Sequence, residues 1–275
     1  MYTQKKLDTQ CLSCYTTIMN TTLGLTCISE ELKDIDKKKY SFRTMTRKRF
    51  NDLCNTEGRN EAIDQLSERI KNNLYVTQYI LRHCGSNDIK HYRLSSSLFP
   101  LLTDQTLELA YADLPNHKTL DAELKLIGKI AKTLNISLSS HPDQFNVLAS
   151  ANENAVNKSI NELNFQASLF DKMGLPQDHT APMNIHINGT PPEIESNNDP
   201  DSINNARIAE MAERFYNNLM RCDQGVYNYR KTTHRIVITH LGEPFELNTT
   251  NARTFEIKWN QLKKSALSIV FTVFW

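Results

Sequence analysis

Short segments of β-forming residues alternate with amphipathic helical segments along most of the chain. The β-type segments are residues 22–28, 91–96, 136–141, 183–188 and 235–241. Between them, apolar residues recur every three or four positions, the spacing that builds one buried helix face. These stripes are Ile63, Leu66, Ile70 and Leu74; Leu120, Leu124, Ile127 and Leu134; Val156, Ile160, Leu163 and Phe170; and Ile208, Met211, Phe215 and Leu219. Such an alternation predicts an α/β fold with parallel strands and crossover helices.

Residues that start or stop helices flank three of these stripes. Asn60 stands at the expected N-cap of the first, and Asp199 followed by Pro200 is a typical start for the last. Gly174 follows the third stripe, where a glycine commonly ends a helix in the left-handed conformation. The helix boundaries therefore agree with the periodicity.

Two α/β architectures fit this pattern, an open doubly wound sheet and a closed (β/α)8 barrel. No glycine-rich phosphate loop follows any of the strands, which argues against a nucleotide cofactor and the open sheet. Ser95, His141 and Asn188 stand instead at the C-terminal ends of successive strands, where barrel enzymes build their sites. We predict a (β/α)8 TIM barrel that is incomplete at its C-terminus, because only five strands can be recognised.

The composition is that of an intracellular globular protein. The 275 residues include 32 Lys and Arg against 31 Asp and Glu, a formal net charge of +1, and 39% are hydrophobic. This balance excludes a dominant polybasic or acidic tail, although a local basic patch could still bind DNA. The N-terminus lacks the apolar core of a secretion signal, and no segment is apolar enough to span a membrane. We therefore expect the six cysteines to be reduced in a cytoplasmic location.

Two neighbouring strands each carry a histidine on a polar face. Alternation places Ser137, Ser139 and His141 on one face of residues 136–141, and His186 with the two asparagines on one face of residues 184–188. Strands covered by helices on both sides are usually almost entirely apolar. The pattern is typical of imidazole ligands converging on a metal ion, but each histidine could also make a single ordinary hydrogen bond.

Four sequence segments resemble the UV damage endonuclease family. They are FRTMTRKRF (residues 42–50), YRLSSSLFP (92–100), SSHPDQFNVLAS (139–150) and NIHIN (184–188). The resemblance extends from about Leu23 to Ile238. It implies a (β/α)8 barrel that holds divalent metal ions, typically Mn²⁺, at the C-terminal mouth of its strands. It also implies incision of the DNA backbone immediately 5′ to a UV photoproduct.

The resemblance assigns three candidate metal ligands. His141 corresponds to the histidine of the family's His-Pro motif, and His186 corresponds to the histidine that ends the fourth strand. A further family histidine falls near Asp104, whose carboxylate could replace it as a ligand of a hard cation.

Candidate DNA-binding residues lie in two loops. The family's Gln-aromatic pair, which is pushed into the duplex at the lesion, falls on Gln144 and Phe145. From its residue type alone, Phe145 could equally be an ordinary core aromatic. The dense basic run includes Arg43 and Arg47, which we expect to contact DNA phosphates unless the run is only a solvated loop face.

The chain departs from the family pattern near its fifth strand. Thr239 stands where the family has a metal-binding glutamate, and His240 and Glu243 do not share its register. Residues 240–275 match none of the remaining barrel units and end in an apolar run. We therefore expect an extension (residues 1–20), a barrel domain (21–239) and an unmatched tail (240–275). A frameshift or truncation after Ile238 would explain the tail, and reading the downstream nucleotide sequence in the other frames would test it.

Three functions remain open at this point. The first is a metal-dependent DNA repair endonuclease, a monomer that acts on damaged double-stranded DNA with Mn²⁺. The second is a non-catalytic remnant that still binds damaged DNA, and the third is a metal-dependent sugar isomerase with a similar barrel. Replacement of Phe145 by alanine separates the isomerase from the other two, because only damage recognition would need its ring. The remnant would bind irradiated DNA in a salt-dependent way but would not cleave it with any metal.

Overall fold

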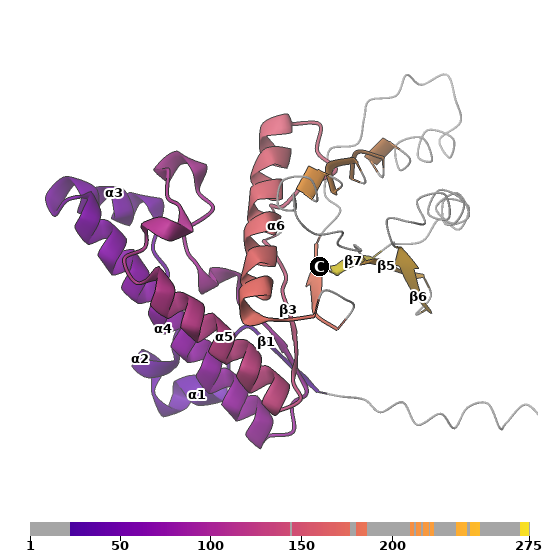
Figure 1. Ribbon diagram of the computed structural model, residues 1–275, viewed down its shortest axis with the longest axis horizontal. Helices are drawn as coiled ribbons and strands as arrows, with labels where there is room; N and C mark the ends of the chain where they lie inside the picture. Colours follow the sequence, from indigo (N-terminus) through magenta and orange to yellow (C-terminus); the bar gives the residue numbers. More distant parts are fainter. Residues whose placement is uncertain are drawn as a thin grey trace, which may run out of the picture.

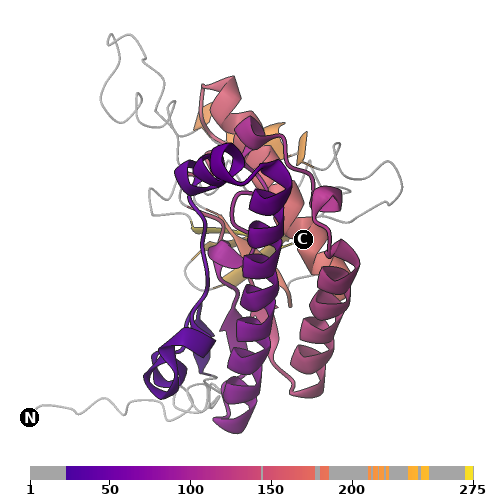
Figure 2. The ribbon, with the colours of Figure 1, turned by 90° about the vertical axis from the view of Figure 1, so that its left-hand side faces the viewer.

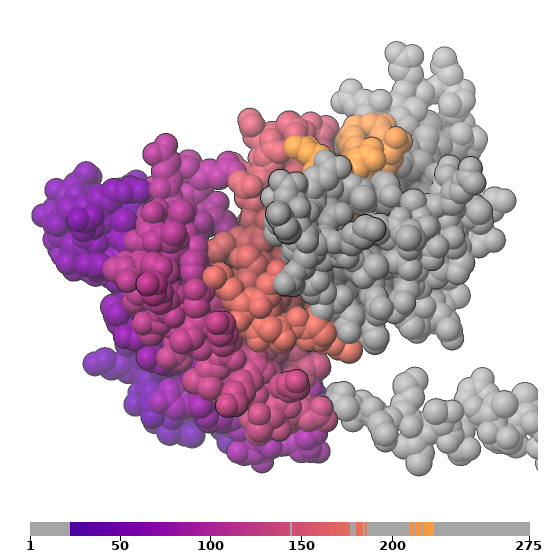
Figure 3. All heavy atoms as spheres, viewed as in Figure 1, coloured from indigo at the N-terminus to yellow at the C-terminus, as the bar shows by residue number. Residues whose placement is uncertain are grey.

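The computed structural model describes residues 23–143, 145–176, 180–185, 235–240, 243–247 and 270–274, with helical positions 210–211, 213–215, 217–219 and 221–222. From β1 to α6 the chain forms one continuous body of helices packed beside a small sheet (Figures 1 and 3). Strands and helices alternate through this body. The α/β fold expected from the sequence is confirmed.

The first three strands form a parallel sheet. They are β1 (Gly24–Thr26), β2 (His91–Arg93) and β3 (Ser137–Ser139), in the order β1-β2-β3. Tyr92 lies opposite Leu25 on one side and Leu138 on the other. Beyond the end of β3, a parallel bridge joins Ser140 to Met183 in β4 (Pro182–Asn184). The first four strands therefore run in the predicted direction, but each is shorter than its β-type segment.

Helices connect these parallel strands. Between β1 and β2 lie α1 (Glu30–Ile35), α2 (Lys37–Tyr40), α3 (Arg47–Thr56) and α4 (Arg59–Ser86). Between β2 and β3 lie three short 3₁₀ helices, η1 (Ser96–Leu98), η2 (Gln105–Leu107) and η3 (Tyr111–Asp113), and then α5 (His117–Thr133). Helix α6 (Glu153–Met173) follows β3. Although α4 has 28 residues, neither it nor any other helix in the described part is apolar enough to cross a membrane.

The helix boundaries confirm one sequence prediction and correct another. Gly174 ends α6 with a φ of 70°, in the left-handed region that glycine favours. Asn60 is not the N-cap of α4, because Gly58 takes that position with a φ of 95°. This backbone turn starts the helix before Asn60, and no cap side chain is needed to set the boundary.

The core lies between the sheet and the long helices α4, α5 and α6, which pack side by side (Figure 2). Leu66, Ile70 and Leu74 of α4 are fully buried, as their spacing predicts. Tyr92 is also fully buried, and its hydroxyl donates to the Cys27 carbonyl at 2.8 Å. That bond satisfies the one polar atom of a large core side chain and links β2 to the end of β1.

The predicted fifth strand exists but lacks the parallel neighbours that a barrel requires. It is β5 (Arg235–His240), and it pairs antiparallel with β6 (Glu243–Leu247) and β7 (Val270–Phe274). The second sheet has the order β4-β7-β5-β6, and β4 also pairs antiparallel with β7. The alternation of apolar residues predicts a strand but carries no information on which strands pair with it. Among the described strands, the parallel succession thus ends at β4.

Candidate functional site

An open groove with a volume of about 580 Å³ lies beside the C-terminal ends of β2 and β3. Four segments that are distant in sequence line it: the basic loop before α3, the loop from η1 to η2, the loop after β3 and the first half of α6. Among the lining side chains are Arg47, Asp104, Asp143, Phe145, Lys158 and Glu162. The structure therefore brings together three of the residues selected from the sequence, Arg47, Asp104 and Phe145.

Asn73 fixes the backbone of the basic loop. This side chain of α4 is fully buried, and its Oδ1 accepts a hydrogen bond from the Arg43 N–H at 2.7 Å. Its Nδ2 donates to the carbonyls of Arg43, Ser97 and Leu98 at 3.0 to 3.2 Å. One buried amide thus ties the basic loop to η1. The sequence prediction missed Asn73, although an asparagine directly before Leu74 on an apolar helix face was a possible signal.

Arg47 and Asp104 form an ion pair at the groove. Arg47 is the first residue of α3, after the N-cap Thr46, and its Nε donates to Asp104 Oδ2 at 2.6 Å. The Arg47 side chain is 57% exposed and the Asp104 side chain is 13% exposed. Partial burial raises the pKa of Asp104, but hydrogen bonds from Thr106 and Arg47 outweigh this effect. The pKa of Asp104 therefore lies below its ordinary value, and the carboxylate is charged at neutral pH.

Asp104 does not fit the expected role of a metal ligand well. Its Oδ1 accepts hydrogen bonds from the backbone N–H of Thr106 at 3.1 Å and from the Thr106 hydroxyl at 2.7 Å. Its Oδ2 is the acceptor for Arg47. Both oxygens are thus engaged within the protein, and coordination of a cation would require these bonds to be exchanged.

His141 fits the metal role better. It is half-buried beyond the end of β3, and its Nδ1 lies 3.0 Å from the Pro142 carbonyl oxygen. A carbonyl can only accept, so Nδ1 is the donor in this contact. Histidines that coordinate metals commonly have this arrangement. The other expected ligand, His186, and the wedge residue Gln144 lie outside the described residues. Within the described residues, no three His, Cys, Asp or Glu side chains converge as a metal site.

The loop after β3 holds Phe145 out in solvent. Phe145 is 77% exposed, and its N–H donates to Asp143 Oδ1 at 3.0 Å. The buried Asn146 donates to the Asp143 carbonyl through both its backbone and its side chain. Val147 ties the same loop to α6 through the Ser159 hydroxyl. The interpretation of Phe145 as a core aromatic is therefore wrong, since a structured turn exposes its ring.

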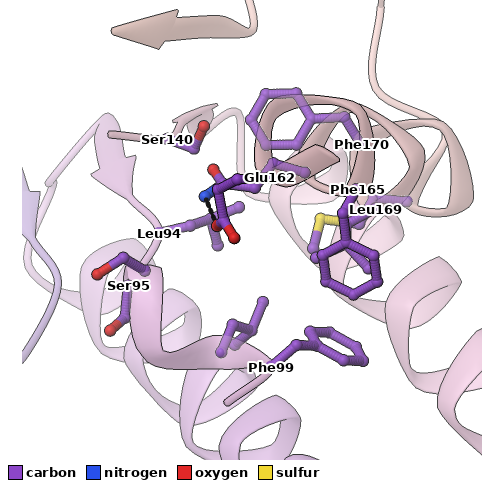
Figure 4. Close-up of a pocket in the computed structure, with 12 residues that line it drawn as sticks. Leu94, Ser95, Phe99, Ser140, Glu162, Phe165, Leu169 and Phe170 are labelled. Carbon is purple, nitrogen blue, oxygen red and sulfur yellow. Dashed lines mark hydrogen bonds between the residues drawn. The ribbon is translucent and has the colours of Figure 1, made fainter. Parts of the chain in front are cut away.

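A small cavity adjoins the groove, with a volume of about 30 Å³ (Figure 4). Phe99, Phe165 and Phe170 give it an apolar wall, and Glu162 reaches into it from α6. The Glu162 carboxylate accepts a hydrogen bond from Gln166 Nε2 at 2.7 Å. The buried Ser140 hydroxyl has no hydrogen-bond partner among the described residues, so the cavity has polar groups for about one water molecule. Glu162 lines both spaces and was not recognised in the sequence.

The polar face of the parallel sheet is built around His91. Its two ring nitrogens each lie 2.8 Å from a serine hydroxyl, Nδ1 from Ser137 and Nε2 from Ser139. Burial and the neighbouring Arg93 lower the pKa of His91 below its ordinary value, so the ring is neutral at pH 7. The predicted shared face of the two serines is confirmed by these contacts. His91 itself was missed, because strand β2 is too short for its own alternation to be read.

Comparison with known proteins identifies the family. The family model described as UV-endonuclease UvdE matches residues 21–221. The chain belongs to this family. The resemblance inferred from the sequence segments is thereby confirmed, and the match ends before β5 and its antiparallel partners.

The aligned regions cover about half of the length of individual UvdE relatives. The chain is 36% identical over 164 residues to a UV DNA damage endonuclease from Nostoc sp. (strain PCC 7120 / SAG 25.82 / UTEX 2576), covering 60% of this chain and 47% of that protein. It is 30% identical over 171 residues to a putative UV-damage endonuclease from Acanthamoeba polyphaga mimivirus, covering 61% and 47%. The crystal structure of SacUVDE matches with a TM-score of 0.50 and 24% identity, over 73% of this chain and 58% of that chain. The chain thus spans about half the length of the curated relatives it matches, and the structural match supports the α/β fold.

Proposed function

We propose that this protein acts on UV-damaged double-stranded DNA as a metal-dependent endonuclease that cuts the backbone 5′ to the photoproduct. The observation that carries the proposal is the groove that Arg47 and the exposed ring of Phe145 both line. An exposed aromatic ring can insert between stacked bases, and a cation in the same groove can contact the phosphates of the duplex. The names of the UvdE relatives support this substrate.

Phe145 would probe the duplex for distortion. Insertion of an apolar ring between two bases unstacks them at a cost of a few kcal/mol, which is lowest where damage has already weakened the stack. The exposed Phe145 would enter the step together with its neighbour Gln144. Arg43 and Arg47 would contact phosphates, which fix position without reading sequence. Recognition would thus depend on how easily the DNA deforms.

His141 and His186 would hold a divalent ion, with Mn²⁺ as our first choice. Such an ion, when bound, stabilises negative charge on the phosphate and lowers the pKa of water. The bond between His141 Nδ1 and the Pro142 carbonyl would orient Nε2 for coordination. We assign this role to His141 on that geometry.

The parallel strands β1 to β4 would be the first four of an incomplete (β/α)8 barrel. The proposed division is an extension (residues 1–20), a barrel domain (21–239) and a tail (240–275). The protein would act as a monomer.

A second function has its own supporting observation. Thr239, at the position expected for a metal-binding glutamate, lies in the antiparallel strand β5 opposite Pro244 and Val270. A protein that lacks this ligand could bind damaged DNA without cutting it. A sugar isomerase is disfavoured, because it would have no use for an exposed ring in the position of Phe145.

A nicking assay tests the proposal. The substrate is an end-labelled duplex with one cyclobutane dimer, incubated with Mn²⁺ or with EDTA. We expect a nick immediately 5′ to the dimer that EDTA abolishes and that His141→Ala removes. His117→Ala is the matched control, because His117 Nδ1 also contacts a backbone carbonyl, that of Leu114 at 2.9 Å, but the residue does not line the groove. Damage-selective binding without any nick would overturn the endonuclease and support the binding protein.

A further inference from the structure

The carboxylate of Asp104 is rigidly held. Its side chain is 13% exposed, and hydrogen bonds reach both of its oxygens from Thr106 and Arg47. Its own backbone N–H donates to the Leu101 carbonyl at 3.0 Å, and the residue caps η2. A carboxylate held in this way is a fixed anchor for whatever it binds.

The Arg47 guanidinium is held through only one of its edges. Nε is bonded to Asp104, and the two Nη groups make no hydrogen bond within the described part of the chain. A guanidinium presents five donors in a planar fork, so an Nη edge remains available for a second acceptor. The side chain is 57% exposed and lines the groove, where a phosphate could reach it.

Arg47 lies at a helix N-terminus, where a positive charge is unfavourable. Arg47, Lys48 and Arg49 occupy the first turn of α3, which contains no acidic residue. The dipole at a helix N-terminus disfavours cations there. Asp104, which is distant in sequence, is the acidic side chain bonded to Arg47. The ion pair thus stabilises a cation at a position where local structure opposes it.

We infer that Asp104 is a positioning residue, which holds the Arg47 guanidinium so that its Nη edge binds a backbone phosphate of the DNA. The inference rests on the proposed function and assigns Asp104 this role in place of metal coordination. Arginine binds phosphate best through two parallel N–H donors, which requires a defined orientation of the fork. A free Arg47 side chain would lose rotamer freedom on binding, whereas the ion pair has already restricted it.

A model based on net charge and a model in which Asp104 positions Arg47 predict opposite effects of Asp104→Asn on DNA affinity. Removal of a negative charge beside a phosphate site should strengthen DNA binding if only net charge matters. If Asp104 positions Arg47, the loss of its carboxylate should weaken DNA binding. Asp113→Asn is the matched control, because Asp113 lies in the same connection and caps η3 by accepting from the Ala110 N–H at 2.7 Å. This variant also removes one negative charge, but Asp113 has no bond to Arg47.

The experiment measures the affinity of the full chain for a fluorescent duplex with one cyclobutane dimer, in EDTA and at several salt concentrations. We expect Asp104→Asn to bind about three- to tenfold more weakly, with a salt slope smaller by roughly 0.9, the value for one phosphate contact. Arg47→Lys, which keeps the charge but loses the fork, should show a similar loss. Asp113→Asn should bind at least as tightly as the wild type.

A second set of measurements separates positioning from the alternatives. In an Arg47→Gln background, Asp104→Asn should cause no further loss, because it acts through the arginine. The content of bound manganese after dialysis should equal that of the wild type. An additive loss, a fall in manganese content, or affinity equal to that of Asp113→Asn would overturn the role of Asp104. A wild-type chain that binds no DNA would instead overturn the proposed function.

Discussion

The side-chain amide of Asn73 and the backbone of Arg43 bond to each other twice. Asn73 Oδ1 accepts from the Arg43 N–H at 2.7 Å, and Asn73 Nδ2 donates to the Arg43 carbonyl at 3.0 Å. The amide imitates a paired strand and gives the basic loop a fixed backbone. The loop therefore takes its position from the core of α4, and the groove depends on a residue that does not line it.

Replacement of Asn73 by leucine should destabilise the protein and loosen the groove. The change leaves the Arg43 N–H and three carbonyls, including the buried one of Leu98, without this partner, so we expect a loss of about 2–4 kcal/mol in the free energy of unfolding. Urea denaturation measures this loss. Asn72→Ala is the control, since the half-buried Asn72 makes one bond, to the Ser41 carbonyl at 3.2 Å, and should cost less than about 1 kcal/mol. Equal losses in the two variants would contradict the central role of Asn73.

Gly128 should not tolerate alanine. A Cβ at this position of α5 would lie 1.8 Å from the Met173 carbonyl oxygen at the end of α6, so the helices would have to separate. We expect Gly128→Ala to lower the free energy of unfolding by about 3 kcal/mol or to prevent folding. In Gly85→Ala the nearest atom is the end of the Leu134 side chain at 2.9 Å, which can move. That variant should be close to wild type, and thermal unfolding of both would show whether the contrast holds.

Phe145→Ala should change recognition without changing stability. The ring is 77% exposed, so its removal should alter the free energy of unfolding by less than about 0.5 kcal/mol. The ratio of affinities for damaged and undamaged duplexes should fall toward one, because the unstacking group is lost. Tyr75→Ala removes an exposed aromatic of α4 that does not line the groove and should leave the ratio intact. An unchanged ratio in Phe145→Ala would rule out the wedge role.

His91 should make the protein sensitive to mild acid. Burial and Arg93 lower the pKa of His91 below 6.5, so the unfolded chain takes up the proton more readily than the folded one. The corresponding stability is fully present above about pH 6.5 and is lost as the pH falls through the lowered folded pKa. The free energy of unfolding measured between pH 7.5 and 5 should fall more steeply in wild type than in His91→Gln. Identical slopes would show that His91 does not cause the sensitivity.

Local periodicity predicts much of the fold because burial repeats with a fixed spacing. The stripe through Leu120, Leu124 and Ile127 marks the buried face of α5, and all three side chains are fully buried. Alternation likewise places Ser137 and Ser139 on one face, where both contact His91, and Leu138 on the other. In these segments, the local spacing of apolar residues and the packing of the folded protein select the same side chains for burial.

The groove could be predicted only in part, since its contacts join residues that are distant in sequence. The basic run and the His-Pro segment direct attention to Arg47 and Phe145, but no local pattern connects Arg47 with Asp104, 57 residues away. The role of Asn73 is hidden for the same reason, because an amide within a helix does not reveal which loop it binds. The antiparallel pairing of β5 with β6 and β7 likewise depends on distant segments and cannot be read from its own residues.

Strand β4 has one neighbour of each direction. It meets the end of β3 through the parallel bridge between Ser140 and Met183, and it pairs antiparallel with β7 on its other edge. A strand has only two hydrogen-bonding edges, so a further parallel strand could join β4 only by displacing β7. The parallel sheet can therefore grow beyond β4 only by exchange of one strand for another. Residues 270–274 would compete with the incoming segment for the same backbone N–H and C=O groups of β4.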